Sequence, residues 1–313
     1  MSVSFLGIDT SNYTTSAALL HENGISASKR MLCVGSGERG LRQSDAVFQH
    51  VKNLPEVLRE LSQNADFDSL SAIGVSDRPR DAEDSYMPCF LAGRCVASST
   101  ASVTNVPLFT FSHQAGHIAA VLYGANRLDL LQKRFLAFHI SGGTTEAVLV
   151  TPDEKKLFRT EIVARSLDLK AGQAIDRVGT MMGLSFPCGA QLDRLAVQGI
   201  QTCPTIKATM KNTDCCLSGI ENRCRKLFAQ QASAPEIAAF CILSVVAALE
   251  AMLTQLRKQF PELEVVFSGG VSSNSILRER LAKYGGIIFS DPALSTDNAV
   301  GIAVLTQIKS QQV

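Results

Sequence analysis

Two of the chain's five histidines, His113 and His117, lie four residues apart in the stretch FSHQAGHIAA. On a helix this spacing places both imidazoles on one face. An imidazole pair one turn apart is a common beginning of a zinc or iron site, which needs at least one more ligand. Asp297, far along the chain in LSTDNAVGIAVL, is a candidate third ligand, although it could equally cap the small apolar helix expected after it. Spacing alone also allows an ordinary helix with packed or solvated histidines.

Three turns rich in Gly, Ser and Thr form the second group of residues that could do chemistry. They are DTSNYTT at 9–15, SGGTT at 141–145 and SGGVSSN at 268–274, and each follows an apolar segment. Amides and hydroxyls in such turns donate to phosphate oxygens, and glycine lets the backbone approach closely. One such turn is weak evidence, whereas three in one chain favour a nucleotide site. Asp168 and Asp176 are carboxylates that could accept from a ribose hydroxyl or lie on a solvated helix face.

The segments that must position these groups alternate between strands and helices. Strands are predicted within 3–11, 14–24, 71–77, 107–112 and 134–153, and helices within 45–63, 93–106, 171–184 and 236–260. Residues 264–285 are predicted to form a strand, a Gly-Gly turn and a helix. The opening pattern FLGIDTSNYTTSAALL returns as AFHISGGTTEAVLV, which is a weak internal repeat. The alternation predicts an α/β fold with crossover connections, in two lobes that each open with a hairpin.

Composition narrows the class of protein. The 313 residues are 46% hydrophobic, carry a net charge of +1 and include no Trp, so no basic stripe or stacking platform for nucleic acid is evident. Nine scattered cysteines without a C-x-x-C pair indicate reduced thiols in a cytoplasmic protein. The first residues show neither the charged nor the apolar region of a signal peptide, and no apolar run is long enough to predict a membrane span.

Taken together, the motifs resemble those of the TsaD family, the tRNA threonylcarbamoyladenosine transferases. SHQAGH is similar to the family's H-x-x-x-H, ISGGTTEAVLV to S-G-G-H-T-x-L, and STDNAVGIA to C-T-D-N-A-A-M-I-A. The opening FLGIDTSNYTT resembles G-I-E-T-S-C-D-E-T, and AGQAIDRVGTMMGLSFPCGA resembles G-E-A-F-D-K followed by P-G-G-P. CLSGIEN is similar to F-S-G-L-K-T, and SGGVSSNSILR to G-G-V-x-A-N-x-x-L-R. These motifs stand in the family's order and span nearly the whole chain.

The resemblance implies an actin-like ATPase fold, in which two ribonuclease-H-like lobes surround a nucleotide cleft. The first lobe would be residues 1–133 with 296–313 returning to it, and the second would be 134–295. The implied metal ligands are His113, His117 and Asp297. The implied substrate and nucleotide contacts are Ser141, Gly142, Gly143, Thr144, Thr145, Asp176, Gly189 and Asn274.

The same resemblance implies a reaction and its partners. The activity would be metal-dependent transfer of a threonylcarbamoyl group from its adenylate to N6 of an adenosine in tRNA. One divalent metal is implied, with iron favoured over zinc, and ATP or threonylcarbamoyl-adenylate would be the ligand. tRNA and the family's partner subunits are the implied partners, with no membrane involved and a cytoplasmic location. The resemblance identifies no catalytic residue and no oligomeric state.

Five positions depart from the family pattern and leave other functions open. Five residues of this chain occupy positions where the family pattern has a different residue. They are Tyr13 in place of a carboxylate, Thr144 in place of His, Gln173 in place of Glu, Cys188 in place of Gly and Glu221 in place of Lys. These departures suggest a diverged paralogue with weakened or redirected transfer, such as a carbamoyl-type transferase with another acceptor. A non-catalytic partner of a true TsaD is a further alternative, and the histidine pair counts against it. A zinc protease is disfavoured because HQAGH lacks the Glu that would follow the first His.

Overall fold

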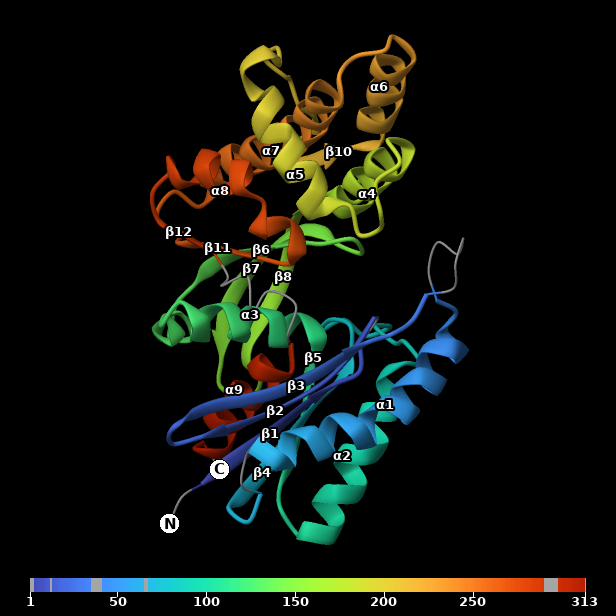
Figure 1. Cartoon of the computed structure of the whole chain (residues 1–313). Coiled ribbons are helices and arrows are strands. Elements are labelled where there is room, and N and C mark those ends of the chain that lie inside the picture. The colour runs from blue at the N-terminus through green and yellow to red at the C-terminus, as the bar shows by residue number, and fades with distance from the viewer. Residues whose placement is uncertain (1–2, 12, 35–40, 65–66, 290–297, 313) are drawn as a thin grey trace. The chain divides into compact units, whose positions relative to one another are not determined.

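The computed structural model describes residues 3–11, 13–34, 41–64, 67–289 and 298–312, apart from the side chains of residues 64 and 202. The chain divides into two compact units (Figure 1). Unit 1 comprises Met1–Leu128 together with Thr296–Val313, and unit 2 comprises Asp129–Ser295. The C-terminal segment therefore returns to the unit in which the chain begins.

Unit 1 is built on a five-stranded sheet of order β3-β2-β1-β4-β5. Its strands are β1 (Ser4–Asp9), β2 (Thr14–His21), β3 (Gly24–Met31), β4 (Leu70–Arg78) and β5 (Leu108–Ser112). The first three strands form an antiparallel meander, and β4 and β5 extend the sheet parallel to β1. The predicted opening hairpin is thus confirmed as β1 and β2.

Four helices cover the sheet of unit 1: α1 (Gln43–Asn64), α2 (Phe90–Thr104), α3 (His113–Gly124) and α9 (Asn298–Ser310). Ile8 of β1 belongs to the apolar cluster under α1 and α2, whereas a Cβ on its neighbour Gly7 would touch Ala299 of α9. Because successive strand residues point to opposite faces, α1 and α2 cover one face and α9 the other. Pro55, which predicts a helix start or kink, lies inside α1, which continues past it.

Helices α3 and α9 pack with their backbones nearly in contact. A Cβ built on Gly301 would lie 1.8 Å from the carbonyl oxygen of Gly116, so neither helix could approach so closely with a side chain there. A Cβ on Gly7 would likewise lie 2.3 Å from the carbonyl oxygen of Ala299. This packing brings the first turn of α9 against the first turn of α3.

Unit 2 repeats the plan of unit 1 with a sheet of order β12-β11-β6-β7-β8. The strands are β6 (Phe135–Ile140), β7 (Thr145–Asp153), β8 (Leu157–Arg165), β11 (Val265–Ser268) and β12 (Ile287–Phe289). As in unit 1, three strands form an antiparallel meander and two more add in parallel to the first of them. The internal repeat expected from the sequence is therefore real.

The rest of unit 2 is mainly helical. Its helices are α4 (Ala171–Met181), α5 (Gly189–Gly199), α6 (Ser218–Ala229), α7 (Ala234–Gln259) and α8 (Ser275–Ala282). Short 3-10 turns occur at η1 (Leu128–Gln132), η2 (Ile200–Thr202) and η3 (Gly270–Ser273), and a small hairpin joins β9 (Thr209–Lys211) to β10 (Asp214–Cys216).

Helix α7 forms the centre of the unit 2 core, as its apolar sequence predicts. Ser233 and Glu236 close its N-terminus with a reciprocal capping box. Of the described segments, α7 has the length and apolar composition of a membrane span, but 72% of the relevant window is buried inside the protein. Such burial is typical of a core helix.

Candidate metal and nucleotide sites

The histidine pair lies on the first two turns of α3. The helix begins after Ser112, whose hydroxyl accepts from the backbone N–H of Ala115 at 3.2 Å. His113 is the first helical residue, and the ring of His117 follows with its centroid 4.5 Å away. The two imidazoles therefore share one face, as their spacing predicts.

Asp9, at the end of β1, lies behind His113. Its Oδ2 atom is 2.9 Å from Nδ1 of His113 and also accepts from the hydroxyl of Ser76, while Oδ1 accepts from the backbone N–H of Ser11. Burial raises the pKa of Asp9, but His113 and Ser11 outweigh burial and lower this pKa to about 2. A carboxylate in this position can accept from an Nδ1–H of His113 and hold the ring by that nitrogen.

Asp9 is a site residue that the sequence reasoning missed. It belongs to the DTSNYTT turn, which was considered only for phosphate. The available signal is a carboxylate at the end of β1, a strand in which all the remaining residues are also buried. A buried charge needs partners, so such a carboxylate is expected to contact polar groups. Its partner His113 lies 104 residues away in the sequence, so no spacing pattern joins them.

The third predicted ligand, Asp297, lies outside the described residues. Its neighbour Asn298 begins α9, and its Nδ2 atom lies 3.0 Å from Nε2 of His113 and closer still to Nδ1. Within the described ranges, no three His, Cys, Asp or Glu residues gather as a metal site. Two imidazoles on one face, one of them backed by a carboxylate, nevertheless fit a divalent iron or zinc ion with a carboxylate completing the set.

A buried histidine of unit 1, His50 of α1, is another residue that the sequence analysis did not identify. Its Nδ1 atom is 2.8 Å from the hydroxyl of Thr15, which itself accepts from Asn53. Its Nε2 atom is buried without a hydrogen-bond partner among the described residues. Burial lowers the pKa of His50 to about 4, against the attraction of Asp9, so the imidazole is neutral at pH 7.

In unit 2, the turn at 141–145 joins β6 to β7 and is held by its own backbone. The N–H of Ser141 donates to the carbonyl of Thr144, and the N–H of Thr144 donates to the Ser141 hydroxyl. The hydroxyl of Thr145 accepts from the N–H of Ala171 at the start of α4. Gly142 has open space around its missing side chain, so this turn can receive a ligand against its backbone.

Two more predicted contacts lie near the start of α5. The carboxylate of Asp176 on α4 accepts from the backbone N–H of Cys188 at 2.8 Å, and burial raises its pKa. Gly189 is the first residue of α5 and also has open space where a side chain would be. The structure therefore brings Asp176 and Gly189 together.

Asn274 is joined to the same helix. It caps the N-terminus of α8, and its amide donates at 2.8 Å to the carboxylate of Asp193 on α5. Asp193 also accepts from the backbone and the hydroxyl of Ser275. Asp193 was missed because nothing in its sequence neighbourhood marks it. Its role is to tie α8 to α5.

Other acidic residues of unit 2 have structural partners. Asp168, considered as a ribose acceptor, accepts from the backbone N–H of Leu217 and from the hydroxyl of Ser218 at the start of α6. Glu221, which stands where the family has Lys, pairs with Arg177 at 3.1 Å and Arg225 at 2.7 Å. The charge reversal at this position is thus accompanied by two guanidinium groups.

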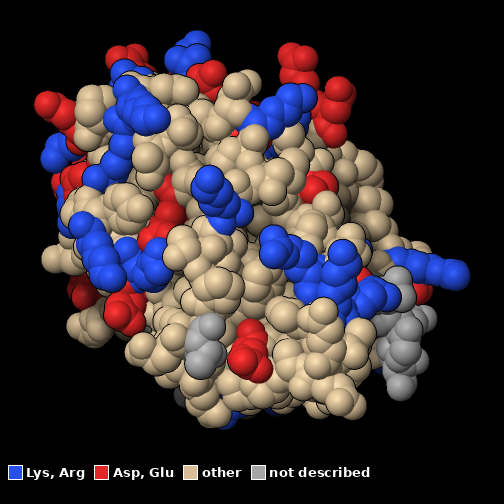
Figure 2. Space-filling model, turned by 90° about the horizontal axis from the view of Figure 1, so that it is seen from above, with Lys and Arg blue, Asp and Glu red and all other residues tan. Residues whose placement is uncertain are grey.

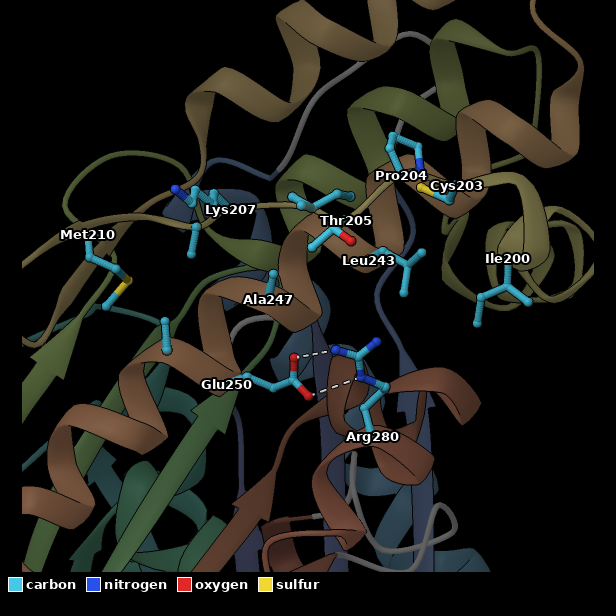
Figure 3. Close-up of a pocket in the computed structure, with 13 residues that line it drawn as sticks. Ile200, Cys203, Pro204, Thr205, Lys207, Met210, Leu243, Ala247, Glu250 and Arg280 are labelled. Atoms are coloured by element: carbon cyan, nitrogen blue, oxygen red, sulfur yellow. Dashed lines mark hydrogen bonds and ion pairs between the residues drawn. The ribbon is translucent and has the colours of Figure 1, made fainter.

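Unit 2 also contains a pocket of about 540 Å³ beneath α7 and α8 (Figure 3). Glu250 and Arg280 form a two-point ion pair on its wall. None of the predicted nucleotide contacts lines this pocket. On the face drawn in Figure 2, basic side chains gather in small groups interrupted by acidic ones.

The fold is that of the actin-like ATPases. The structure resembles component A of (R)-2-hydroxyglutaryl-CoA dehydratase from Acidaminococcus fermentans, with a TM-score of 0.58 and 15% identity over 99% of each chain. It also resembles HypF of T. kodakarensis, with a TM-score of 0.59 and 12% identity over 99% of this chain and 48% of that one. The predicted fold class is confirmed.

The chain belongs to the TsaD family, whose model, described as tRNA N6-adenosine threonylcarbamoyltransferase, matches residues 37–304. The tRNA N6-adenosine threonylcarbamoyltransferase of Bacillus subtilis is 30% identical over 95% of this chain and 88% of its own. The enzyme of the same name from Listeria monocytogenes is 31% identical over 95% of this chain and 89% of its own. The one from Neorickettsia sennetsu is 27% identical over 95% of this chain and 91% of its own. The resemblance drawn from the motifs and the assignment to a family of transferase enzymes are confirmed.

Proposed function

We propose that this chain transfers a threonylcarbamoyl group from its adenylate to N6 of an adenosine in tRNA. Family membership supports the reaction class, because the matching model spans most of the chain. The observation that carries the proposal is the contact between Asp9 and His113, which aligns the face that His113 shares with His117. A buried carboxylate behind one histidine of a pair is typical of a metal site.

The proposed site would hold one divalent metal through His113, His117 and Asp297, with iron favoured over zinc. Two imidazoles and one carboxylate form the donor set typical of iron(II) sites with open positions. Such an ion supplies Lewis-acid chemistry at a phosphate or carbamoyl oxygen. The protein's own contribution is to fix the donors, and Asp9 does so by holding the ring of His113.

The adenylate would bind in unit 2 at the turn from Ser141 through Gly142, Gly143 and Thr144 to Thr145, with Asp176, Gly189 and Asn274 as further contacts. Open space at Gly142 and Gly189 supports this assignment, because both allow a ligand to approach the backbone. Cys188 donates to Oδ1 of Asp176, and the other carboxylate oxygen of Asp176 can accept from a ribose hydroxyl.

In the proposed reaction, N6 of adenosine forms a bond to the carbamoyl carbon and the bond from that carbon to the phosphate oxygen breaks. AMP leaves, and the N6 proton passes to a base that we do not assign. The chain's residues act by holding both reactants in place, which is a large part of the rate enhancement in group transfer. The proposed partners are tRNA and the family's partner subunits, in the cytoplasm.

A second candidate is a carbamoyl-type transferase with another acceptor. It is favoured by Tyr13 and Thr144, which replace a charged and a titrating side chain of the family pattern. Glu221 argues less strongly for divergence than its sequence suggests, because Arg177 and Arg225 supply positive charge beside it. Products formed with tRNA separate the two candidates.

The metal proposal has a direct test. Protein prepared without oxygen and supplied with iron(II) or zinc should carry about one equivalent of metal, and His113→Ala should carry none. His21→Ala, which changes the last residue of β2 in unit 1, is the matched control and should bind metal like wild type. Equal, near-zero metal in wild type and His113→Ala would contradict the site.

A further inference from the structure

Asn298 lies where Gly301 and Gly116 allow α9 to pack closely against α3. It is the first residue of α9 and is only 3% exposed. Gly301, about one turn later, lies directly against the backbone of Gly116, the residue before His117. This close approach places the carboxamide of Asn298 beside the ring of His113.

The hydrogen bonds around His113 define what the carboxamide does. Oδ2 of Asp9 lies 2.9 Å from Nδ1 of His113 and engages that ring nitrogen. The Nδ2 atom of Asn298 lies 3.0 Å from Nε2 of His113 and closer still to Nδ1, so the amide packs against the ring at both of its nitrogens. The carboxamide of Asn298 therefore lies beside the ring that would hold a metal.

The other end of the same carboxamide has no partner. Oδ1 of Asn298 is buried and accepts no hydrogen bond from the described residues. Buried acceptors are nearly always satisfied, so this oxygen beside His113 has the capacity to accept from, or bind to, a group placed there. A half-turn about the bond that carries the amide exchanges its oxygen and nitrogen without moving the backbone.

We propose that Asn298 is a further residue of the metal site, and this inference rests on the proposed function. With no cation bound, its amide nitrogen lies against the ring of His113. With a cation bound, the amide turns and presents its oxygen to the ion or to a water on it. An amide oxygen suits iron(II) and manganese(II) better than zinc, which favours nitrogen and sulfur in closed tetrahedral sites, so Asn298 would contribute to metal selection.

The experiment measures the affinity of the full chain for iron(II), manganese(II) and zinc by competition with a chelator, without oxygen. Asn298→Ala should bind iron(II) and manganese(II) about 10-fold or more weakly, with a smaller loss for zinc. Asn298→Asp, which keeps an oxygen and the size of the side chain, should bind at least as tightly as wild type. Thr306→Val removes another buried polar group from α9 and should bind like wild type.

A second readout does not need the metal. In metal-free protein with labelled histidines, nitrogen NMR should show that Asn298→Ala shifts the ring signals of His113 and leaves those of His21 unchanged. Wild-type binding by Asn298→Ala, or weaker binding by Asn298→Asp, overturns the inference while the metal site stands. Equal losses in Asn298→Ala and Thr306→Val would also overturn it, by showing that α9 was merely disturbed. Absence of metal from wild type defeats the site and the inference together.

Discussion

Oδ2 of Asp9 lies 2.9 Å from Nδ1 of His113, joining the end of β1 to the first residue of α3. The carboxylate is fully enclosed and receives further hydrogen bonds from Ser11 and Ser76. Because these donors fix Asp9, the imidazole ring beside it is fixed as well. The orientation of the histidine pair is thus set by a strand end far from it in the sequence.

Asp9→Asn should weaken metal binding by about 10- to 100-fold, because an amide is a poorer acceptor for the Nδ1–H of His113. The measurement is chelator competition with iron(II) on oxygen-free protein. Asp45→Asn, an exposed residue at the start of α1, is the control and should leave affinity unchanged. If Asp9→Asn bound metal as tightly as wild type, the ring would be oriented by something else.

His50 should make stability depend on pH between about 6.5 and 4. Its folded pKa of about 4 lies below its ordinary value of 6.5, so the unfolded chain binds more protons in this window. The contribution of neutral His50 to the free energy of unfolding is therefore fully present above pH 6.5 and is lost as the pH is lowered. The free energy of unfolding should fall by about 2 kcal/mol between pH 7 and pH 5. The lowered pKa of Asp9 acts at lower pH, below its ordinary value of 3.8.

Urea unfolding at pH 7, 6 and 5 measures this effect. His50→Gln keeps a polar side chain but does not titrate, so the difference between wild type and His50→Gln should shrink as the pH falls. Parallel pH dependence of the two proteins would show that His50 is not the titrating group.

Gly301→Ala should destabilise unit 1 by about 3 kcal/mol, because the new methyl would meet the carbonyl oxygen of Gly116 and backbone cannot move aside cheaply. Thermal unfolding gives the change. Gly219→Ala is the matched control, since it lies in α6 with open space around it and should be neutral or slightly stabilising. A tolerated Gly301→Ala would mean that α3 and α9 are less tightly packed than described.

Asp176→Ala should weaken adenine nucleotide binding by about 1–3 kcal/mol through loss of a ribose acceptor. Calorimetry with ATP, in the presence of metal, compares this variant with wild type. Glu154→Ala, an exposed residue in the turn between β7 and β8, should bind normally. No measurable affinity in the wild type would contradict the nucleotide site.

The sequence predicted features that depend on local spacing. The histidine pair follows from the helical period, and the paired hairpins and α7 follow from runs of apolar residues. The outer strands β3 and β8 were missed because their side chains are mostly not buried, so their strand character depends on pairing with β2 and β7. Their sequences, GISASKRM and LFRTEIVAR, carry little alternation that could have marked them.

Contacts between distant residues could not be predicted in this way. Asp193 reaches Asn274 across 81 positions, and Asn298 reaches His113 across 185. Each contact arises from helix packing, as where Gly301 meets Gly116, rather than from any pattern near the residue. The motifs therefore identified candidate ligands, and the fold identified the residues that hold them.

The most direct test is to assay tRNA for threonylcarbamoyladenosine with this chain as the sole family member, supplied with threonylcarbamoyl-adenylate, iron(II) and the family's partner subunits. The account predicts that the modified nucleoside forms with wild type and is lost with His113→Ala. Tyr13 and Thr144 lead us to expect slower formation than with the Bacillus subtilis relative. Wild-type protein that binds metal and nucleotide but forms no modified adenosine would contradict the proposed function and favour another acceptor.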